Sequence, residues 1–168
     1  QNQLFDDALS ALINLGYKKS QAEQTLKKVC GKDIEGSSIE NLIKGLVIQS
    51  GNDAAVALAE YVAGSEAAFV EMMNQAATGL NLNGTHYVNS TGLPHPDHFS
   101  TARDISRLAG IITQQFPEHY RYYSIKEFAW KGIRQKNRNK LLWRDETVDG
   151  VKTGHTRSAG YCLVGSAE

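Results

Sequence analysis

Two short motifs in this chain carry residue types suited to acyl transfer, and they lie about a hundred residues apart. Lys152-Thr153-Gly154 offers a positive charge, a hydroxyl donor and a position without a side chain, where an extended peptide could lie against the backbone. Ser50-Gly51-Asn52 offers a hydroxyl that could relay a proton and a carboxamide that could donate to a substrate amide. Serine acyl transfer needs such groups beside a nucleophile, a base and an oxyanion hole.

Each motif alone also has a simpler interpretation. Ser50 could be a plain helix cap, and Lys152 could be a solvated lysine on a strand. Their order favours the catalytic interpretation, because the sequence predicts that one precedes a helix and the other lies on a strand. Together they match the second and third motifs of penicillin-recognising serine peptidases. The first motif of that class, Ser-x-x-Lys, is absent from the 168 residues: Ser124 comes closest, but Lys126 follows it at the wrong spacing.

Composition and charge exclude several other classes of protein. The chain has 18 basic and 18 acidic side chains and a formal net charge of zero, so no single-sign field favours nucleic acid or an anionic membrane. With 41% hydrophobic residues it is long enough for a real core. The five histidines and the two cysteines, Cys30 and Cys162, lack metal-ligand spacing. We predict no metal and no cofactor, and two cysteines that are buried or half-buried rather than paired.

Nothing in the sequence predicts membrane insertion. The first residues lack the basic start and apolar run of a signal peptide, and no apolar stretch is long enough to span a bilayer. We read the chain as a fragment or an assembled sequence.

The pattern along the chain predicts an α+β fold that is mostly helical. Ser20, Ser38, Ser65 and either Ser100 or Thr101 are typical helix caps, and Gly64 is a typical stop. Helices are predicted over about 4–15, 20–29, 38–46, 51–62, 65–78 and 101–116. Strands are predicted late, over 125–130, 151–153 and 161–164, with the last two joined through a turn from residue 154 to 160.

From residue 42 onward the sequence resembles the D-alanyl-D-alanine carboxypeptidases, the low-molecular-mass penicillin-binding proteins of the bacterial envelope. The resemblance rests on segments 42–46, 49–54, 89–93, 100–104, 138–143, 148–156 and 159–161. It implies a truncated penicillin-binding-protein or β-lactamase-like transpeptidase domain with an incomplete antiparallel sheet. It also implies that Ser50 and Asn52 belong to the second catalytic motif and that Lys152, Thr153 and Gly154 bind substrate, a peptidoglycan peptide or a β-lactam.

Residues 1–45 are predicted to be a separate unit. Their helical pattern with a Leu15-Gly16-Tyr17 turn resembles the C-terminal three-helix domain of the Holliday-junction subunit RuvA and, more generally, ubiquitin-associated (UBA) domains. This implies a contact with the RuvB ATPase, for which Leu4, Leu15 and Tyr17 are candidates if they are not the unit's own core. We predict a chimera of residues 1–45 and residues 46–168, natural or made, whose parents belong to the cytoplasm and the cell envelope.

Three hypotheses for function follow. The first is a carboxypeptidase remnant that holds its substrate but, without a nucleophile, does not turn it over. The second is an interaction module whose N-terminal helices bind RuvB. The third is a shuffled or engineered chain with no native activity, whose incomplete sheet favours strand-mediated dimers. The basic stretch 131–144, flanked by Trp130 and Trp143, could suggest single-stranded nucleic acid, but the peptidase resemblance favours a surface hairpin.

Overall fold

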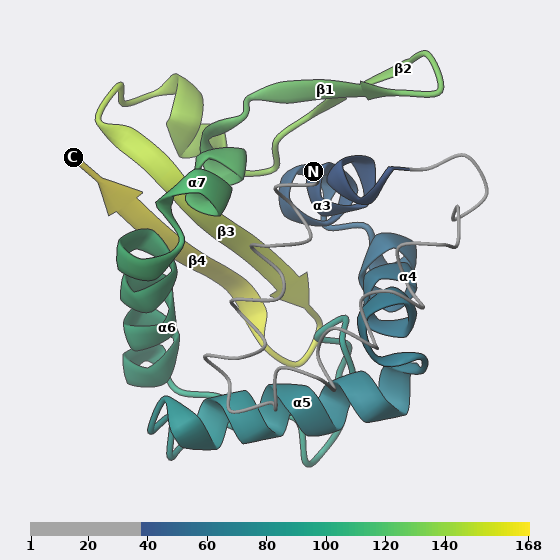
Figure 1. Cartoon of the computed structure of the whole chain (residues 1–168). Coiled ribbons are helices and arrows are strands. Elements are labelled where there is room, and N and C mark those ends of the chain that lie inside the picture. Colours follow the sequence, from purple (N-terminus) through teal and green to yellow (C-terminus); the bar gives the residue numbers. More distant parts are fainter. Residues whose placement is uncertain (1–37) are drawn as a thin grey trace.

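The computed structural model describes residues 38–168, in which helices come first and two β-hairpins come last (Figure 1). The helices are α3 (Ile39–Gln49), α4 (Asn52–Ala63), α5 (Glu66–Gly79), α6 (Ala102–Gln115) and α7 (Pro117–Tyr120), with 3-10 turns η1 (Arg121–Ser124) and η2 (Lys140–Trp143). The strands are β1 (Glu127–Trp130), β2 (Ile133–Lys136), β3 (Val148–Thr156) and β4 (Gly160–Ala167). The described part is therefore a mostly helical α+β fold, while the three-helix unit predicted for residues 1–45 falls largely outside it.

The helix starts lie where capping side chains predicted them. The Ser38 and Ser65 hydroxyls accept hydrogen bonds from the third residue of their helices, each at 3.2 Å, and Thr101 accepts one from the Asp104 N–H at 3.1 Å. Gly64, at φ 82°, ends α4 in the left-handed conformation. These three caps and this stop are confirmed, because each depends only on residues close in sequence.

The C-terminal hairpin is longer than the sequence predicted. β3 and β4 form one antiparallel pair, in which Lys152 faces Val164 and Thr153 faces Leu163. The predicted turn began at Gly154, but Gly154 pairs with Cys162 and His155 pairs with Tyr161. The His155 and Tyr161 rings lie 4.3 Å apart and extend the contact beyond the backbone ladder. The prediction was wrong here because glycine was taken as a turn signal although it lies within the ladder.

The basic stretch begins as a surface hairpin. β1 pairs antiparallel with β2, and Glu127 forms ion pairs with Arg134 and Lys136, the latter at 3.9 Å. Its second half folds into η2, where Leu142 is buried. The two sheets of the described residues each have two strands, which agrees with the incomplete antiparallel sheet expected from the sequence.

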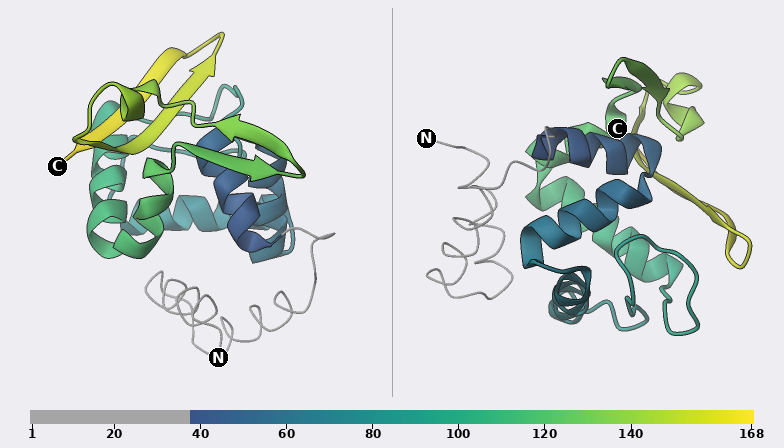
Figure 2. Two further views of the ribbon diagram at one scale, coloured as in Figure 1. Left: turned by 90° about the horizontal axis from the view of Figure 1, so that it is seen from above. Right: turned by 90° about the vertical axis from the view of Figure 1, so that its right-hand side faces the viewer.

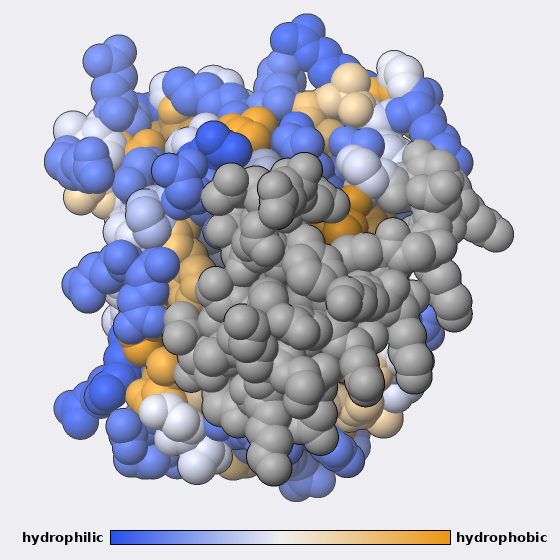
Figure 3. Space-filling model, viewed as in Figure 1, coloured by the Kyte–Doolittle hydropathy of each residue, from blue (hydrophilic) through white to orange (hydrophobic). Residues whose placement is uncertain are grey.

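The core lies where α3 packs on α4 and where the hairpin of β1 and β2 contacts α3 (Figure 2). Ile48 of α3 and Ala59 of α4 are fully buried, and Ala54 and Ala55 are nearly so. The alanines of α4 let neighbouring backbones approach closely. Hydrophilic side chains ring much of the face in Figure 3, with smaller hydrophobic areas between them. No helix of residues 38–168 combines the length and apolar character needed to cross a bilayer.

Side chains pin the long connection between α5 and α6. Asn74 of α5 donates to the Tyr87 carbonyl and accepts from its N–H, each at 2.8 Å. Glu66 accepts from the Ser90 N–H at 3.0 Å and from its hydroxyl at 2.6 Å. These bonds replace the regular ladder that a connection rich in glycine, proline and asparagine cannot form.

One bond in this connection should make stability depend on pH. The Val88 N–H donates to His98 Nδ1 at 3.2 Å, and burial, followed by the charges of His86 and His95, lowers the pKa of His98 below its usual value. The unfolded chain therefore binds a proton first as pH falls from about 6.5, and stability present above that pH is lost below it. We expect the free energy of unfolding to fall by about 1 kcal/mol or less, which is the contribution of one hydrogen bond.

Urea unfolding at pH 7.5 and pH 5 would measure this effect. The His98→Gln variant should show a smaller difference between the two pH values, whereas His155→Gln, at an exposed position of the hairpin, should behave like the parent chain. An unchanged difference in His98→Gln would contradict the assignment to His98.

Candidate functional site

Ser50 lies at the sharp junction between α3 and α4. Its backbone is left-handed, at φ 59° and ψ 43°, and its N–H donates to the Leu46 carbonyl at 3.0 Å. The Gly51 N–H donates to Gly45 O at 3.1 Å, and the Ser50 bond to Leu46 is that of an αL cap at the end of α3. This conformation costs a residue with a side chain about 1 kcal/mol, and strained residues cluster at functional sites. Gly51, and not Ser50, is the N-cap of α4, whereas Ser50 is the C-cap of α3.

Lys152 joins the Lys152-Thr153-Gly154 motif to the Ser50-Gly51-Asn52 motif. It lies on β3, and its ammonium donates to Ser50 Oγ and, at 3.0 Å, to the Thr153 carbonyl oxygen. An ammonium carries three donors, so one N–H remains for a third acceptor. The structure therefore brings together two motifs that are 102 residues apart in the sequence.

The surroundings of Lys152 make its charge less stable than that of a surface lysine. Burial of the ammonium, and secondarily the positive charge of Arg138, lowers the pKa of Lys152 from its usual value of 10.5. The amine consequently releases its proton more readily, and it does so beside a hydroxyl. A group with this property, next to Ser50, can either attract a carboxylate or relay a proton.

The segment before η2 holds the end of α3 in place. Arg138 donates through its backbone N–H to Ile48 O at 3.2 Å and through Nε to Gln49 O at 2.7 Å. Gln49 donates in return to the Lys136 carbonyl at 3.1 Å. Ser50 follows directly, so these bonds fix the point from which its hydroxyl faces Lys152. Arg138 was recognised from sequence only as part of a matching segment.

The other three predicted residues, Asn52, Thr153 and Gly154, are close in sequence to Ser50 or Lys152. The fold holds them less tightly than it holds that pair. Asn52 is exposed at the start of α4, and its side chain makes no hydrogen bond to another described residue. Thr153 is half-buried and Gly154 is exposed on β3. A Cβ built on Gly154 would meet only the Cβ of Cys162, at an ordinary 3.9 Å. The fold thus has room for a side chain at position 154.

Asn139 is the residue that the sequence did not single out. It is 1% exposed, its Nδ2 donates to the Gly150 carbonyl at 3.1 Å, and its Oδ1 accepts from the Leu141 N–H at 3.2 Å. Gly150 precedes Lys152 by two residues on β3. Asn139 therefore positions the strand that carries the motif. The available signal in the sequence was a pair of asparagines, Asn137 and Asn139, that precedes the apolar residues 141–143.

Two other kinds of site considered from the sequence are a metal site and the cysteine side chains. Within residues 38–168 no group of three or more His, Cys, Asp or Glu side chains is placed to hold a metal ion. Cys162 is a free, exposed thiol, which corrects the expectation of a buried or half-buried side chain, since β4 is exposed on both faces at Tyr161, Cys162 and Leu163. Cys30 lies outside the described residues.

A helical layer carrying Ser-x-Asn at a helix junction, facing Lys-Thr-Gly on an adjacent strand, defines a penicillin-recognising peptidase domain. Residues 10–168 match the family described as D-alanyl-D-alanine carboxypeptidase, peptidase S11. The chain belongs to this family.

Relatives and solved structures agree with the assignment. The chain is 49% identical over 138 residues to D-alanyl-D-alanine carboxypeptidase DacD of Escherichia coli, which covers 81% of this chain and 35% of the relative. Penicillin-binding protein 5 of Haemophilus influenzae superposes with a TM-score of 0.75 at 45% identity, over 77% of this chain and 38% of that one. DacD of Francisella tularensis superposes at 0.76 and 33% identity, over 78% and 44%. The chain thus spans about a third of the length of the curated relatives it matches.

The comparisons give no support to a RuvA-like unit. The family match begins at residue 10, inside the segment that the sequence assigned to a different parent. The described residues start at 38 and so include only the last part of the predicted unit. Leu4, Leu15 and Tyr17, the candidates for a RuvB contact, lie outside them.

Proposed function

We propose that this chain carries the substrate-binding side of a D-alanyl-D-alanine carboxypeptidase site. In this proposal Lys152 and Thr153 hold the terminal carboxylate of a peptidoglycan stem peptide, and the peptide backbone lies along β3 past Gly154. Ser50 relays a proton, and Asn52 donates to the substrate amide. A β-lactam would occupy the same place, because it carries a carboxylate and an amide in a similar arrangement.

One observation carries the proposal: the Lys152 ammonium donates to Ser50 Oγ while one of its donors remains available. The exposed Asn52 carboxamide has no hydrogen-bond partner inside the described fold, and Gly154 leaves room beside β3 for a bound peptide. Penicillin-binding protein D2 of Listeria monocytogenes, 32% identical, has been solved in cefotaxime-bound and ampicillin-bound forms, with a TM-score of 0.72 for each. These structures support a β-lactam as the probe for this chain.

The proposal includes the absence of turnover by the 168 residues alone. None of their serines is followed by a lysine at the third position, and the relay groups without a nucleophile cannot form an acyl-enzyme. We expect binding without acylation, in which a β-lactam dissociates unchanged.

A labelled penicillin tests both parts. Incubation with a fluorescent penicillin should leave no covalent band on a denaturing gel, whereas a native titration should show reversible binding. Lys152→Gln should weaken that binding by about tenfold or more, because a charged hydrogen bond is worth about 1.5–3 kcal/mol. Lys140→Gln, an exposed lysine of η2, is the matched control and should bind like the parent chain.

Two results would count against the proposal in different ways. A covalent band would show that another group acylates, and equal binding by Lys152→Gln and the parent would remove Lys152 from the site. Gly154→Val tests the proposed position of the peptide independently, because the valine side chain would occupy the exposed face along which the peptide is proposed to lie.

The division into residues 1–45 and 46–168 stays a prediction, as does the origin of the chain as a chimera. A contact with RuvB and a strand-mediated dimer are likewise predictions without a supporting observation. Light scattering of the purified chain would decide the dimer.

A further inference from the structure

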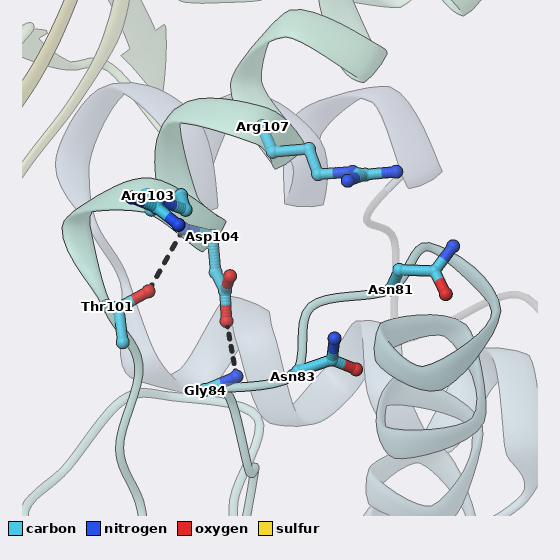
Figure 4. A pocket seen from close by; sticks show the side chains of 7 residues that line it. All are labelled: Asn81, Asn83, Gly84, Thr101, Arg103, Asp104 and Arg107. Carbon is cyan, nitrogen blue, oxygen red and sulfur yellow. Dashed lines mark hydrogen bonds between the residues drawn. The ribbon is translucent and has the colours of Figure 1, made fainter.

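A cavity of about 470 Å³ lies away from the motif residues, between the first turns of α6 and the segment that follows α5 (Figure 4). Its volume falls within the range of small-molecule sites, about 300–1,000 Å³. None of Ser50, Asn52, Lys152, Thr153 and Gly154 borders it. The lining residues are Asn81, Asn83, Gly84, Thr101, Arg103, Asp104 and Arg107.

The cavity has a surplus of positively charged donors. Arg103 and Arg107 are four residues apart on α6, which places them on one face of the helix. Both are exposed, and neither forms an ion pair with another residue in the range 38–168. In Figure 4 the Arg107 guanidinium extends toward the side on which Asn81 and Asn83 lie. Carboxamides from one wall therefore face a guanidinium from the other.

The one carboxylate of the lining is already engaged. Asp104 is buried, and its Oδ2 accepts from the Gly84 N–H at 2.8 Å and from the Thr85 hydroxyl at 2.7 Å. These two bonds tie the segment after α5 to the first turn of α6. They hold the two walls of the cavity together. Asp104 forms no ion pair with Arg103 or Arg107. The lining as a whole has a net charge of +1, from two arginines and one aspartate.

We propose that this cavity binds a small oxyanion-bearing ligand, with Arg107 and Arg103 as the charged donors and Asn81 and Asn83 as neutral ones. A planar guanidinium pairs with a carboxylate or phosphate through two parallel N–H···O bonds, which a lysine cannot reproduce. The site is independent of the proposed function, since it shares no lining residue with the Ser50–Lys152 contact. Its two sources of oxyanion are a peptide carboxylate and free phosphate.

The test is an NMR titration of the isotopically labelled 168-residue chain with N-acetylglutamate, with its uncharged diamide and with inorganic phosphate. We expect the charged compounds to shift the amide signals of Asn83 and Gly84 and to leave that of Lys152 unmoved. The diamide should shift none of them. Arg107→Gln should weaken binding by about tenfold or more, and added salt should weaken it too.

Matched variants separate a specific site from general attraction. Arg144→Gln removes an equally exposed arginine after η2 and should bind like the parent chain. Arg107→Lys keeps the charge without the planar fork and should bind less tightly than the parent. Tighter binding of N-acetylglutamate assigns the site to a carboxylate, and tighter binding of phosphate assigns it to phosphate. Absence of shifts with both anions, or equal losses in Arg107→Gln and Arg144→Gln, would overturn the proposal.

Discussion

Replacing Asn139 by alanine should destabilise the folded chain by about 2–4 kcal/mol, since a buried carbonyl and a half-buried N–H lose their partners at once. The Gly150 carbonyl loses the Asn139 amide, and the Leu141 N–H loses its oxygen acceptor. The side chain is 1% exposed, so water cannot take over these roles without a structural change. Urea unfolding followed by tryptophan fluorescence would measure the loss.

Two further variants make this result specific to the hydrogen bonds. Asn139→Asp keeps an acceptor for Leu141 but presents a charge to the Gly150 carbonyl, so it should be at least as unstable as Asn139→Ala. Asn83→Ala removes the same side chain from an exposed position and should change stability by about 0.5 kcal/mol or less. An Asn139→Ala chain as stable as Asn83→Ala would show that Asn139 does not hold β3.

Gly150→Ala should destabilise the chain by about 1–3 kcal/mol or more, the cost of overpacking in a close-packed interior. The added Cβ would lie 2.5 Å from Tyr120 Oη, 3.2 Å from Tyr120 Cζ and 3.3 Å from Tyr123 Cβ. Tyr120 cannot easily yield, because it is buried and its hydroxyl contacts Asp149 at 3.2 Å and also Ser166. Either β3 or the tyrosine must therefore shift. Unfolding in urea again gives the magnitude.

The same strand provides the control. Gly154→Ala adds an identical methyl group four residues further along β3, where it meets only Cys162 Cβ at 3.9 Å. We expect a change of about 0.5 kcal/mol or less. Combining Gly150→Ala with Tyr120→Phe removes the closest clashing atom and should recover part of the loss, as a double-mutant cycle would show. Equal stabilities for the two alanine variants would contradict the steric explanation.

The features that could be predicted from the sequence are those that depend on residues close to one another along the chain. The caps Ser38, Ser65 and Thr101 were visible because capping is a matter of three residues. The full length of β3 and β4 was not, because strand pairing is decided across the hairpin, as His155 and Tyr161 illustrate.

The candidate site divides in the same way. Lys152 and Ser50 were identified because their motifs have a recognisable residue order. Asn139 and Arg138 escaped notice as positioning groups, since their roles depend on which backbone carbonyls the fold brings to them. Buried side chain-to-backbone bonds of this kind leave little periodic signal in a sequence.

The separation of Ser50 and Lys152 along the chain also has a consequence for folding. Their contact closes a loop of 102 residues, whose entropic cost must be met before the contact contributes any stability. During synthesis, α3, α4 and α5 leave the ribosome well before the strand that carries Lys152 exists. The Ser50–Lys152 contact can therefore form only after the hairpin of β3 and β4 has been made.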